Sequence, residues 1–172
     1  MATDIQSDLV RFTEGFRSEH RAARDIFLGI GRALADRDAT RIGDLMGQAD
    51  QGIGPHMQYE EEEMYPALAS LYGDEYVERM LEDHDRAFGV AGRLMELASH
   101  DPISDEDVEE GNRIIQGLLP HVTDCDGLVL AIEVLPEEGQ RRIFAARDRA
   151  LAEPITMMEW GKRRSRQPRP AE

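Results

Sequence analysis

The sequence predicts an all-α protein, an up-down four-helix bundle with a short extra C-terminal helix. Apolar residues recur at intervals of three and four along four long segments, which is the spacing of one helix face. No segment shows the strict alternation of apolar and polar residues that is typical of a strand. Turn-forming residues separate the segments, so consecutive helices are expected to run in opposite directions.

The chain length is that of a single domain. The sequence has 172 residues, which is enough to bury a hydrophobic core. We expect the bundle to occupy residues 1–155 and a flexible basic tail to occupy residues 156–172. Within this tail, residues 161–172 contain five basic residues and two prolines, a composition typical of disorder.

Charge and cysteine content limit the classes of partner. The formal net charge of −15 argues against nucleic acid and anionic membranes as general partners. One cysteine, Cys125, excludes an intrachain disulfide framework and suits a reducing compartment. The sequence shows no signal-peptide pattern and no apolar stretch of bilayer length, so we expect a cytoplasmic protein. The basic tail could bind an acidic protein, although a solvated tail is the simpler interpretation.

The first half of the chain predicts two long helices. The first spans about residues 4–37, and the second begins near Thr40. We expect residues 52–55, Gly-Ile-Gly-Pro, to interrupt the second helix, because proline lacks an amide donor. Pro66 is expected to bend the following segment, which ends at Gly73.

The second half predicts two further long helices and a short one. The third spans residues 74–99 and is followed by a turn at residues 100–103. Ser104 and Asp107 resemble a capping box and open the fourth helix, which Pro120 is expected to disturb. A short terminal helix is expected from about residue 136 to residue 152.

Four of the five histidines fall on the inward faces of the long helices, one on each. Ligands on successive antiparallel helices are level when the turn lies midway between them. The three midpoints fall at residue 38, at residue 70 and between residues 102 and 103, on or near predicted turns. One layer of the core could therefore contain His20, His56, His84 and His121.

Carboxylates near this layer favour a metal site. A lone inward histidine is usually a hydrogen-bonded core residue, but four at one height are costly to bury without a metal or carboxylates. Glu60 lies one turn after His56, and Asp126 follows His121 by five residues, with Asp124 as the competing choice. Four imidazoles and two carboxylates exceed one tetrahedral zinc site and suit two metals with bridging carboxylates.

These spaced residues resemble the hemerythrin-like (HHE cation-binding) family. The resemblance covers roughly residues 10–135. It is carried by residues 16–20 (Phe-Arg-Ser-Glu-His), by His56-x-x-x-Glu60 with residues 64–66 (Met-Tyr-Pro), by residues 82–84 (Glu-Asp-His), and by His121-x-x-x-x-Asp126. It implies a four-helix bundle with two non-haem iron ions, with or without an oxo or hydroxo bridge.

The resemblance also implies a role for each ligand. His20 and His56 would bind one iron, His84 and His121 the other, and Glu60 and Asp126 would bridge them. Respiratory members have a further histidine one turn before the third-helix histidine. Met80 occupies that position here, and a thioether is a poor ligand for ferric iron. Glu63 is a candidate replacement.

Three functions are compatible with such a site. The protein could be an oxidoreductase that decomposes peroxide or activates oxygen, which the methionine favours. It could instead bind or sense oxygen or nitric oxide without turnover, or it could be an iron-handling regulatory module. Pocket shape is not visible in a sequence, so no organic substrate is predicted.

Overall fold

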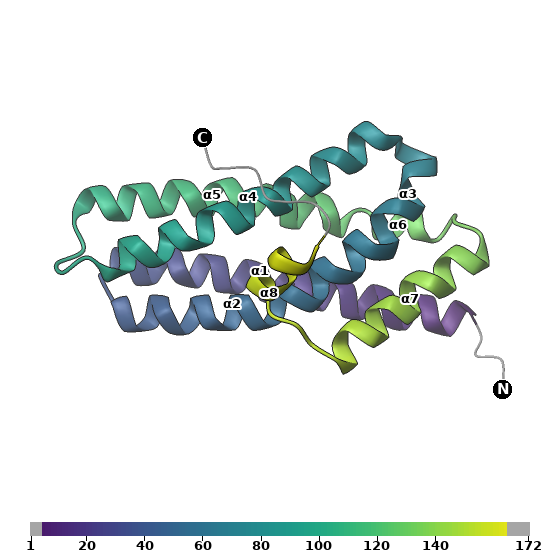
Figure 1. Ribbon diagram of the computed structural model, residues 1–172, viewed down its shortest axis with the longest axis horizontal. Coiled ribbons are helices and arrows are strands. Elements are labelled where there is room, and N and C mark those ends of the chain that lie inside the picture. Colours follow the sequence, from purple (N-terminus) through teal and green to yellow (C-terminus); the bar gives the residue numbers. More distant parts are fainter. Residues whose placement is uncertain (1–4, 165–172) are drawn as a thin grey trace.

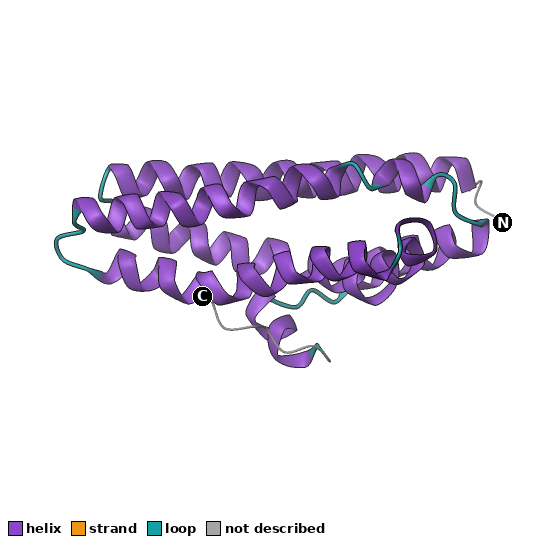
Figure 2. Ribbon diagram, turned by 90° about the horizontal axis from the view of Figure 1, so that it is seen from above, coloured by secondary structure: helices purple, strands orange, loops and turns teal. Residues whose placement is uncertain are grey.

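A computed structural model describes residues 5–164 of the chain, and it is helical throughout apart from short turns (Figure 2). Within these residues there is no strand, which confirms the all-α prediction. No helix in this range combines the length and the apolar character that crossing a membrane requires. The elements are α1 (Ile5–Ala35), α2 (Ala39–Tyr59), the π-helix η1 (Glu60–Met64), α3 (Tyr65–Tyr72), α4 (Asp74–Ser99), α5 (Asp105–Asp126), α6 (Val129–Ile132), α7 (Glu137–Ala152) and α8 (Met157–Arg163).

The long helices α1, α2, α4 and α5 lie lengthwise in a bundle (Figure 1). The α1–α2 turn and the α4–α5 turn lie at the same end, on the left of Figure 1. They contact each other, because Nε of Arg37 donates a 3.1 Å hydrogen bond to the carbonyl oxygen of Ile103. Side chains at one height on the four helices therefore face a common core.

One predicted helix start, that of α5, has the expected chemistry. The hydroxyl of Ser104 accepts a hydrogen bond from the backbone N–H of Asp107, whose carboxylate accepts from the backbone N–H of Ser104. This capping box opens α5, as the sequence predicted. Gly73 precedes α4 with a φ of 82°, a conformation that favours glycine.

The prediction that residues 52–55 interrupt the second helix is wrong. Helix α2 continues through Pro55 to Tyr59, since a proline removes one hydrogen bond and the flanking turns can preserve the helix. Pro120 likewise lies within α5 without ending it. The irregularity instead lies upstream of Pro66, in η1, where the N–H of Tyr65 donates to the carbonyl of Glu60. Pro66 cannot donate to the carbonyl four residues earlier, which is consistent with the widened turn at that point.

We expected a flexible tail at residues 156–172, but the first part of this segment is helical. Residues 157–163 form α8, which lies against α2 and α4 near the middle of the bundle (Figure 1). Met157 and Trp160 are buried there, and Arg164 is only 4% exposed. The apolar residues of α8 were sufficient to dock the segment despite its charge. The remainder of the expected tail, residues 165–172, lies outside the described residues.

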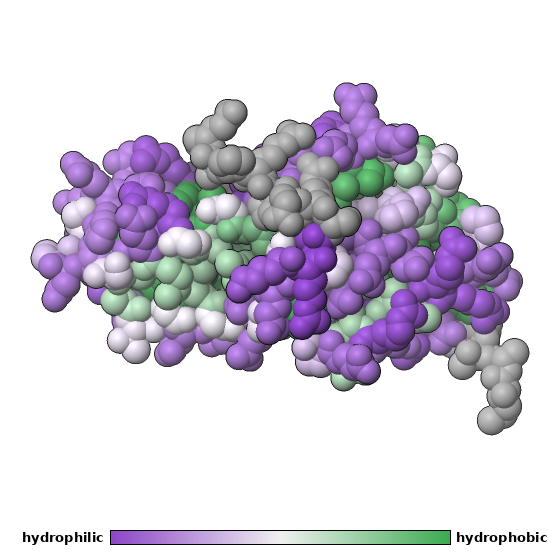
Figure 3. All heavy atoms as spheres, viewed as in Figure 1, coloured by the Kyte–Doolittle hydropathy of each residue, from purple (hydrophilic) through white to green (hydrophobic). Residues whose placement is uncertain are grey.

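Two large apolar clusters occupy the two halves of the bundle. One includes Phe16 on α1 and Met80 on α4, and the other includes Phe27 on α1 and Leu94 on α4. On both helices the inward histidine lies between the two clusters. The surface in Figure 3 is largely hydrophilic, with a band of apolar and weakly polar residues over the left half of α2 and α4. The histidine layer thus divides the core near its middle.

Candidate metal centre

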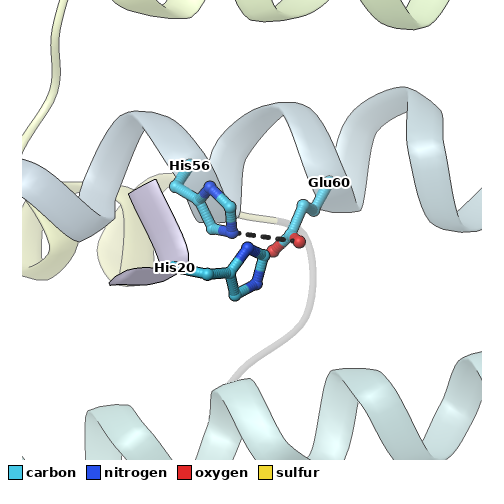
Figure 4. Close-up of side chains that lie close together, drawn as sticks. All are labelled: His20, His56 and Glu60. Atoms are coloured by element: carbon cyan, nitrogen blue, oxygen red, sulfur yellow. Dashed lines mark ion pairs between the residues drawn. The ribbon is translucent and has the colours of Figure 1, made fainter. Parts of the chain in front are cut away.

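Two groups of ligating side chains share one carboxylate at the centre of the bundle. The first group is His20, His56 and Glu60, and the second is Glu60, His84 and His121. Within each group the ligand atoms lie within 4.8 Å of one another. Figure 4 shows the first group, with His20 from α1 facing His56 and Glu60 from the second helical segment. The sequence prediction that these five residues converge is therefore reproduced by the structure.

The imidazole rings are paired as the groups require. His20 and His56 have ring centroids 4.5 Å apart, and His84 and His121 have centroids 4.9 Å apart. Each ring comes from a different long helix. The rings lie at one height because the turns lie near the midpoints between successive histidines. One side of the layer is thus formed by α1 and α2, and the other by α4 and α5.

Glu60 directs one oxygen to each pair of histidines. Its Oε1 lies 3.1 Å from Nε2 of His56, and its Oε2 lies 3.3 Å from Nε2 of His84. The side chain is fully buried, and Oε2 has no hydrogen-bond partner among the described residues. An ionised carboxylate is costly to bury unless it is paired or binds a metal. The two oxygens of one buried carboxylate therefore face different groups of histidines.

Each histidine has an acceptor near its outer ring nitrogen. Nδ1 of His20 lies 3.0 Å from the carbonyl oxygen of Phe16, and Nδ1 of His56 lies 2.7 Å from Oε2 of Glu19. An acceptor at Nδ1 fixes the tautomer and leaves Nε2 free to bind a metal, as in most metal-binding histidines. The same arrangement recurs in the second group.

In that group both outer acceptors are carboxylates. Nδ1 of His84 lies 2.8 Å from Oε1 of Glu61. Nδ1 of His121 lies 3.3 Å from Oδ2 of Asp83 without forming a hydrogen bond. Carboxylates in this position increase the basicity of an imidazole toward a metal.

Two arginines hold the outer carboxylates in place. Nε of Arg147 on α7 donates a 2.9 Å hydrogen bond to Oε1 of Glu19. A Cβ at Gly15 would collide with this guanidinium, so the glycine leaves room for Arg147 in this position. Nε of Arg164, just after α8, lies 2.9 Å from Oε2 of Glu61. The last described segments of the chain therefore support the histidine layer from outside.

The pKa values of the two histidines in the first group are shifted in opposite directions. Burial lowers the pKa of His20 to about 4, with a further contribution from the neighbouring His56. Burial also opposes protonation of His56, but the charges of Glu60 and Glu19 outweigh it and raise the pKa of His56 to about 9. Burial likewise acts against the charged form of Glu60, yet His56 and His84 hold the pKa of that carboxyl well below its usual value. A proton on His56 thus partly balances the carboxylate in the absence of a cation.

Asp126 does not join either group, contrary to the expected bridging role. Its side chain is 40% exposed, and Oδ2 lies 3.7 Å from Nε of Arg17. Helix α5 is regular from His121 onward, so the residue four positions later faces the same way and the residue five positions later does not. That inward residue is Cys125, whose thiol donates a 2.9 Å hydrogen bond to Oε1 of Glu60. The competing candidate, Asp124, is exposed.

Glu63 also lies outside both groups. Its carboxylate is 3.5 Å from Nε of Arg142, at the surface. A turn of the π-helix contains one residue more than an α-helical turn, so the α-helical spacing from Glu60 no longer holds. Glu61 is the residue that turns toward His84 instead. Met80 is buried one turn before His84, as the sequence predicted, and packs in the apolar cluster with Phe16.

Sequence reasoning missed the outer acceptors and the hydrogen bond from Cys125 to Glu60. Glu19 immediately precedes His20, and Asp83 immediately precedes His84, yet neighbouring residues on a helix point in different directions. Each of these carboxylates serves the histidine of another helix, and no sequence spacing indicates that. Cys125 had a usable signal, since four residues after His121 is the same helix face.

Each group of side chains could hold a metal ion. It would supply two imidazole nitrogens and one oxygen of Glu60, and Oε2 of Glu60 has no hydrogen-bond partner among the described residues. Nitrogen and carboxylate oxygen donors suit first-row divalent and trivalent metals, iron included. Three protein donors in each group would leave room for further ligands on a bound ion.

Comparison with known families supports the same assignment. The model described as the hemerythrin HHE cation binding domain matches residues 11–132 of the chain. The matched range contains all five residues of the two groups. No curated protein and no solved structure matches the chain.

Proposed function

Because the chain belongs to the hemerythrin HHE cation-binding domain family, we propose that its two ligand groups hold a pair of non-haem iron ions. In this proposal α1, α2, α4 and α5 act as an up-down four-helix bundle around the pair. Glu60 bridges the ions, His20 and His56 bind one, and His84 and His121 bind the other. Asp126 and Glu63 are surface residues in this assignment. The orientation of the two Glu60 oxygens toward separate histidine pairs is the observation that carries it.

The open positions favour an oxidoreductase. A bound iron pair supplies redox equivalents and Lewis-acid positions for oxygen or peroxide chemistry. Met80 stands where a further histidine would reduce the open positions. We therefore propose peroxide decomposition, in which one peroxide is oxidised to dioxygen and another is reduced to water. This reaction balances without an outside reductant.

Residues of the chain position the ligands and hold protons at the site. Glu19 fixes His56, and Tyr59 donates a 2.7 Å hydrogen bond to Oε2 of Glu19. The hydroxyl of Tyr65 lies 3.2 Å from Nε2 of His84. Burial and the neighbouring Cys125 raise the pKa of Tyr65 well above its usual value, so this phenol keeps its proton beside the site.

Metal analysis and peroxide kinetics test this function. The purified protein should contain about two iron atoms per chain after iron-replete expression. It should evolve oxygen from peroxide, and Met80→His should slow this turnover because a histidine one turn from His84 can fill an open position. A folded protein that retains no iron, or one zinc instead, would contradict the metal assignment. Iron without oxygen evolution would contradict the enzyme.

The second candidate is a protein that binds oxygen or nitric oxide without turnover. An apolar cavity beside the histidines favours it, because neutral diatomic molecules partition into apolar space. A long-lived, reversible oxygen complex in stopped-flow absorbance would support this candidate over the enzyme. An iron-handling regulatory module has no specific support among the described residues. Location in the cytoplasm and the lack of nucleic-acid and membrane partners stay predictions.

A further inference from the structure

A cavity of about 230 Å³ adjoins the histidine layer on one side. All four histidines line it, and Glu60 does not. On each long helix the lining continues from the histidine toward the end with the α1–α2 and α4–α5 turns. Its farthest residues are Phe27 on α1, Met46 on α2, Leu94 on α4 and Gly117 on α5. The cavity therefore runs along the bundle axis, away from Glu60 and Cys125.

The walls of this cavity are apolar. Beyond the histidines they consist of alanine, glycine and larger aliphatic or aromatic residues, such as Ile26, Ile53 and Val90. The charged lining residues are Glu19, Asp83 and Arg86, which lie next to the layer in sequence and are already paired. No lining side chain beyond the layer could neutralise a charged ligand.

Small residues create the space. Ala49 and Gly52 on α2 and Ala87 and Ala91 on α4 line it. Ala49 and Ala91 are buried, so their short side chains leave space inside the bundle. Gly52 is exposed, and a Cβ there would meet no atom within 4 Å. The cavity therefore opens to solvent beside Gly52.

The size of the cavity indicates the size of its occupant. An engineered apolar cavity of about 150 Å³ in another protein stays dry and binds benzene. The present cavity is larger, so it can accept a monocyclic aromatic ring with a short substituent. The volume of the cavity is larger than the volume of a diatomic molecule.

We propose that this cavity binds a small uncharged apolar organic molecule, of the size of toluene, against the histidine layer. Binding itself needs only the apolar walls. The placement of this ligand beside a reactive metal pair rests on the proposed function. The pale band over α2 and α4 in Figure 3 covers the two helices that supply the small wall residues. Met157 of α8 closes part of the wall between them.

Calorimetric titration of the metal-free protein with toluene tests the proposal. Toluene should bind and raise the melting temperature, while benzoate, with the same ring and a charge, should not. Ala87→Leu on α4 and Ala23→Leu on α1 should each weaken toluene binding at least tenfold by filling the cavity. Ala145→Leu, the same substitution at an exposed position of α7, should leave it unchanged.

Two cavity variants are used so that the test still works if one of them does not fold. Toluene that does not bind the unsubstituted protein would overturn the inference, as would equal binding to the cavity variants and Ala145→Leu. Repeating the titration after iron loading separates this inference from the proposed function. A protein that binds toluene but no iron would contradict only the function. One that binds iron but no toluene would contradict only the inference.

Discussion

The thiol of Cys125 donates a 2.9 Å hydrogen bond to Oε1 of Glu60, the carboxylate that both histidine pairs share. Burial and the nearby Glu60 charge raise the pKa of this thiol well above its usual value, so a neutral donor faces the carboxylate. Cys125→Asp should destabilise the metal-free protein, on the order of 3 kcal/mol, because it buries a second unpaired charge. Ferrous iron should reverse this loss. Melting curves with and without iron measure both effects, with Cys125→Asn as the uncharged control. An unchanged response to iron would contradict the position assigned to this side chain.

Removing the shared carboxylate should release metal from both sides of the layer. Glu60→Ala should lower the iron content of the purified protein far more than Glu62→Ala, because Glu62 is exposed and bonds to Gln58. Asp126→Ala should behave like Glu62→Ala, since its side chain faces Arg17. Elemental analysis of the three variants decides the point. Iron loss in Asp126→Ala would restore this residue as a bridging ligand.

Removing the Arg164 guanidinium should destabilise the fold as well as the histidine layer. Its Nη1 donates a 2.7 Å hydrogen bond to Oδ1 of Asp85, and Nε faces Glu61. Arg164→Met leaves both carboxylates buried without this cation, which costs about 3–5 kcal/mol in other proteins. Arg163→Met, at the exposed neighbouring residue, should change the unfolding free energy by less than about 0.5 kcal/mol. Urea unfolding measures both values, and equal midpoints would be inconsistent with the buried pairing.

A methyl group at Gly54 should displace α8. Its Cβ would collide with the carbonyl oxygen of Ile155 and the nitrogen of Met157. Gly54→Ala should therefore shift the fluorescence of buried Trp160, the sole tryptophan, to longer wavelength and cost about 1–3 kcal/mol. Gly47→Ala in the same helix meets no atom within 4 Å and should stabilise it slightly. Identical emission spectra for the two variants would show that α8 is not seated on α2.

The stability of the metal-free protein should peak near pH 6.5. Since the pKa of His20 is about 4 in the fold, the unfolded chain binds more protons between pH 4 and 6.5, and stability rises with pH there. Since the pKa of His56 is about 9 in the fold, the folded chain binds more protons between pH 6.5 and 9, and stability falls there. Each limb is worth at most about 3 kcal/mol.

Urea unfolding across this pH range measures the profile. His56→Gln should reduce the decline above pH 6.5. The remainder would come from His84, whose pKa is also raised, despite burial, by Glu60 and Glu61. Bound iron should remove the decline, because the metal takes the place of the protons. A metal-free protein whose stability stays constant from pH 6.5 to 9 would refute the raised pKa of His56.

Apolar spacing and turn residues predicted the parts of the fold that depend on local sequence. Ser104 marked the start of α5, and the midpoints between histidines fell close to the real turns. His20, His84 and the others converge because those turns set the helix lengths. Local patterns were misleading at Pro55, where tertiary packing keeps α2 continuous.

The rest of the site depends on contacts between distant segments. Arg164 lies 103 positions after Glu61 and 79 positions after Asp85 in the sequence, and no local pattern indicates such a pairing. Asp126 was expected to reach inward because of its position after His121, but α5 continues to this residue and its side chain faces Arg17. Cys125 faces Glu60 because α5 is regular at that point.

The π-helix at Glu60–Met64 has a consequence for chain length. A π turn contains one residue more than an α turn, so the segments on either side of η1 differ in phase by about 100°. Deleting one residue among 61–63 would restore an unbroken α-helix and rotate Tyr65 and Leu68 away from the core relative to His56. Loops usually tolerate such a deletion. In this helix, the histidine layer and the buried residues after it could no longer face the core at the same time. An ungapped alignment of this segment with an unbroken α-helix would pair residues from different faces.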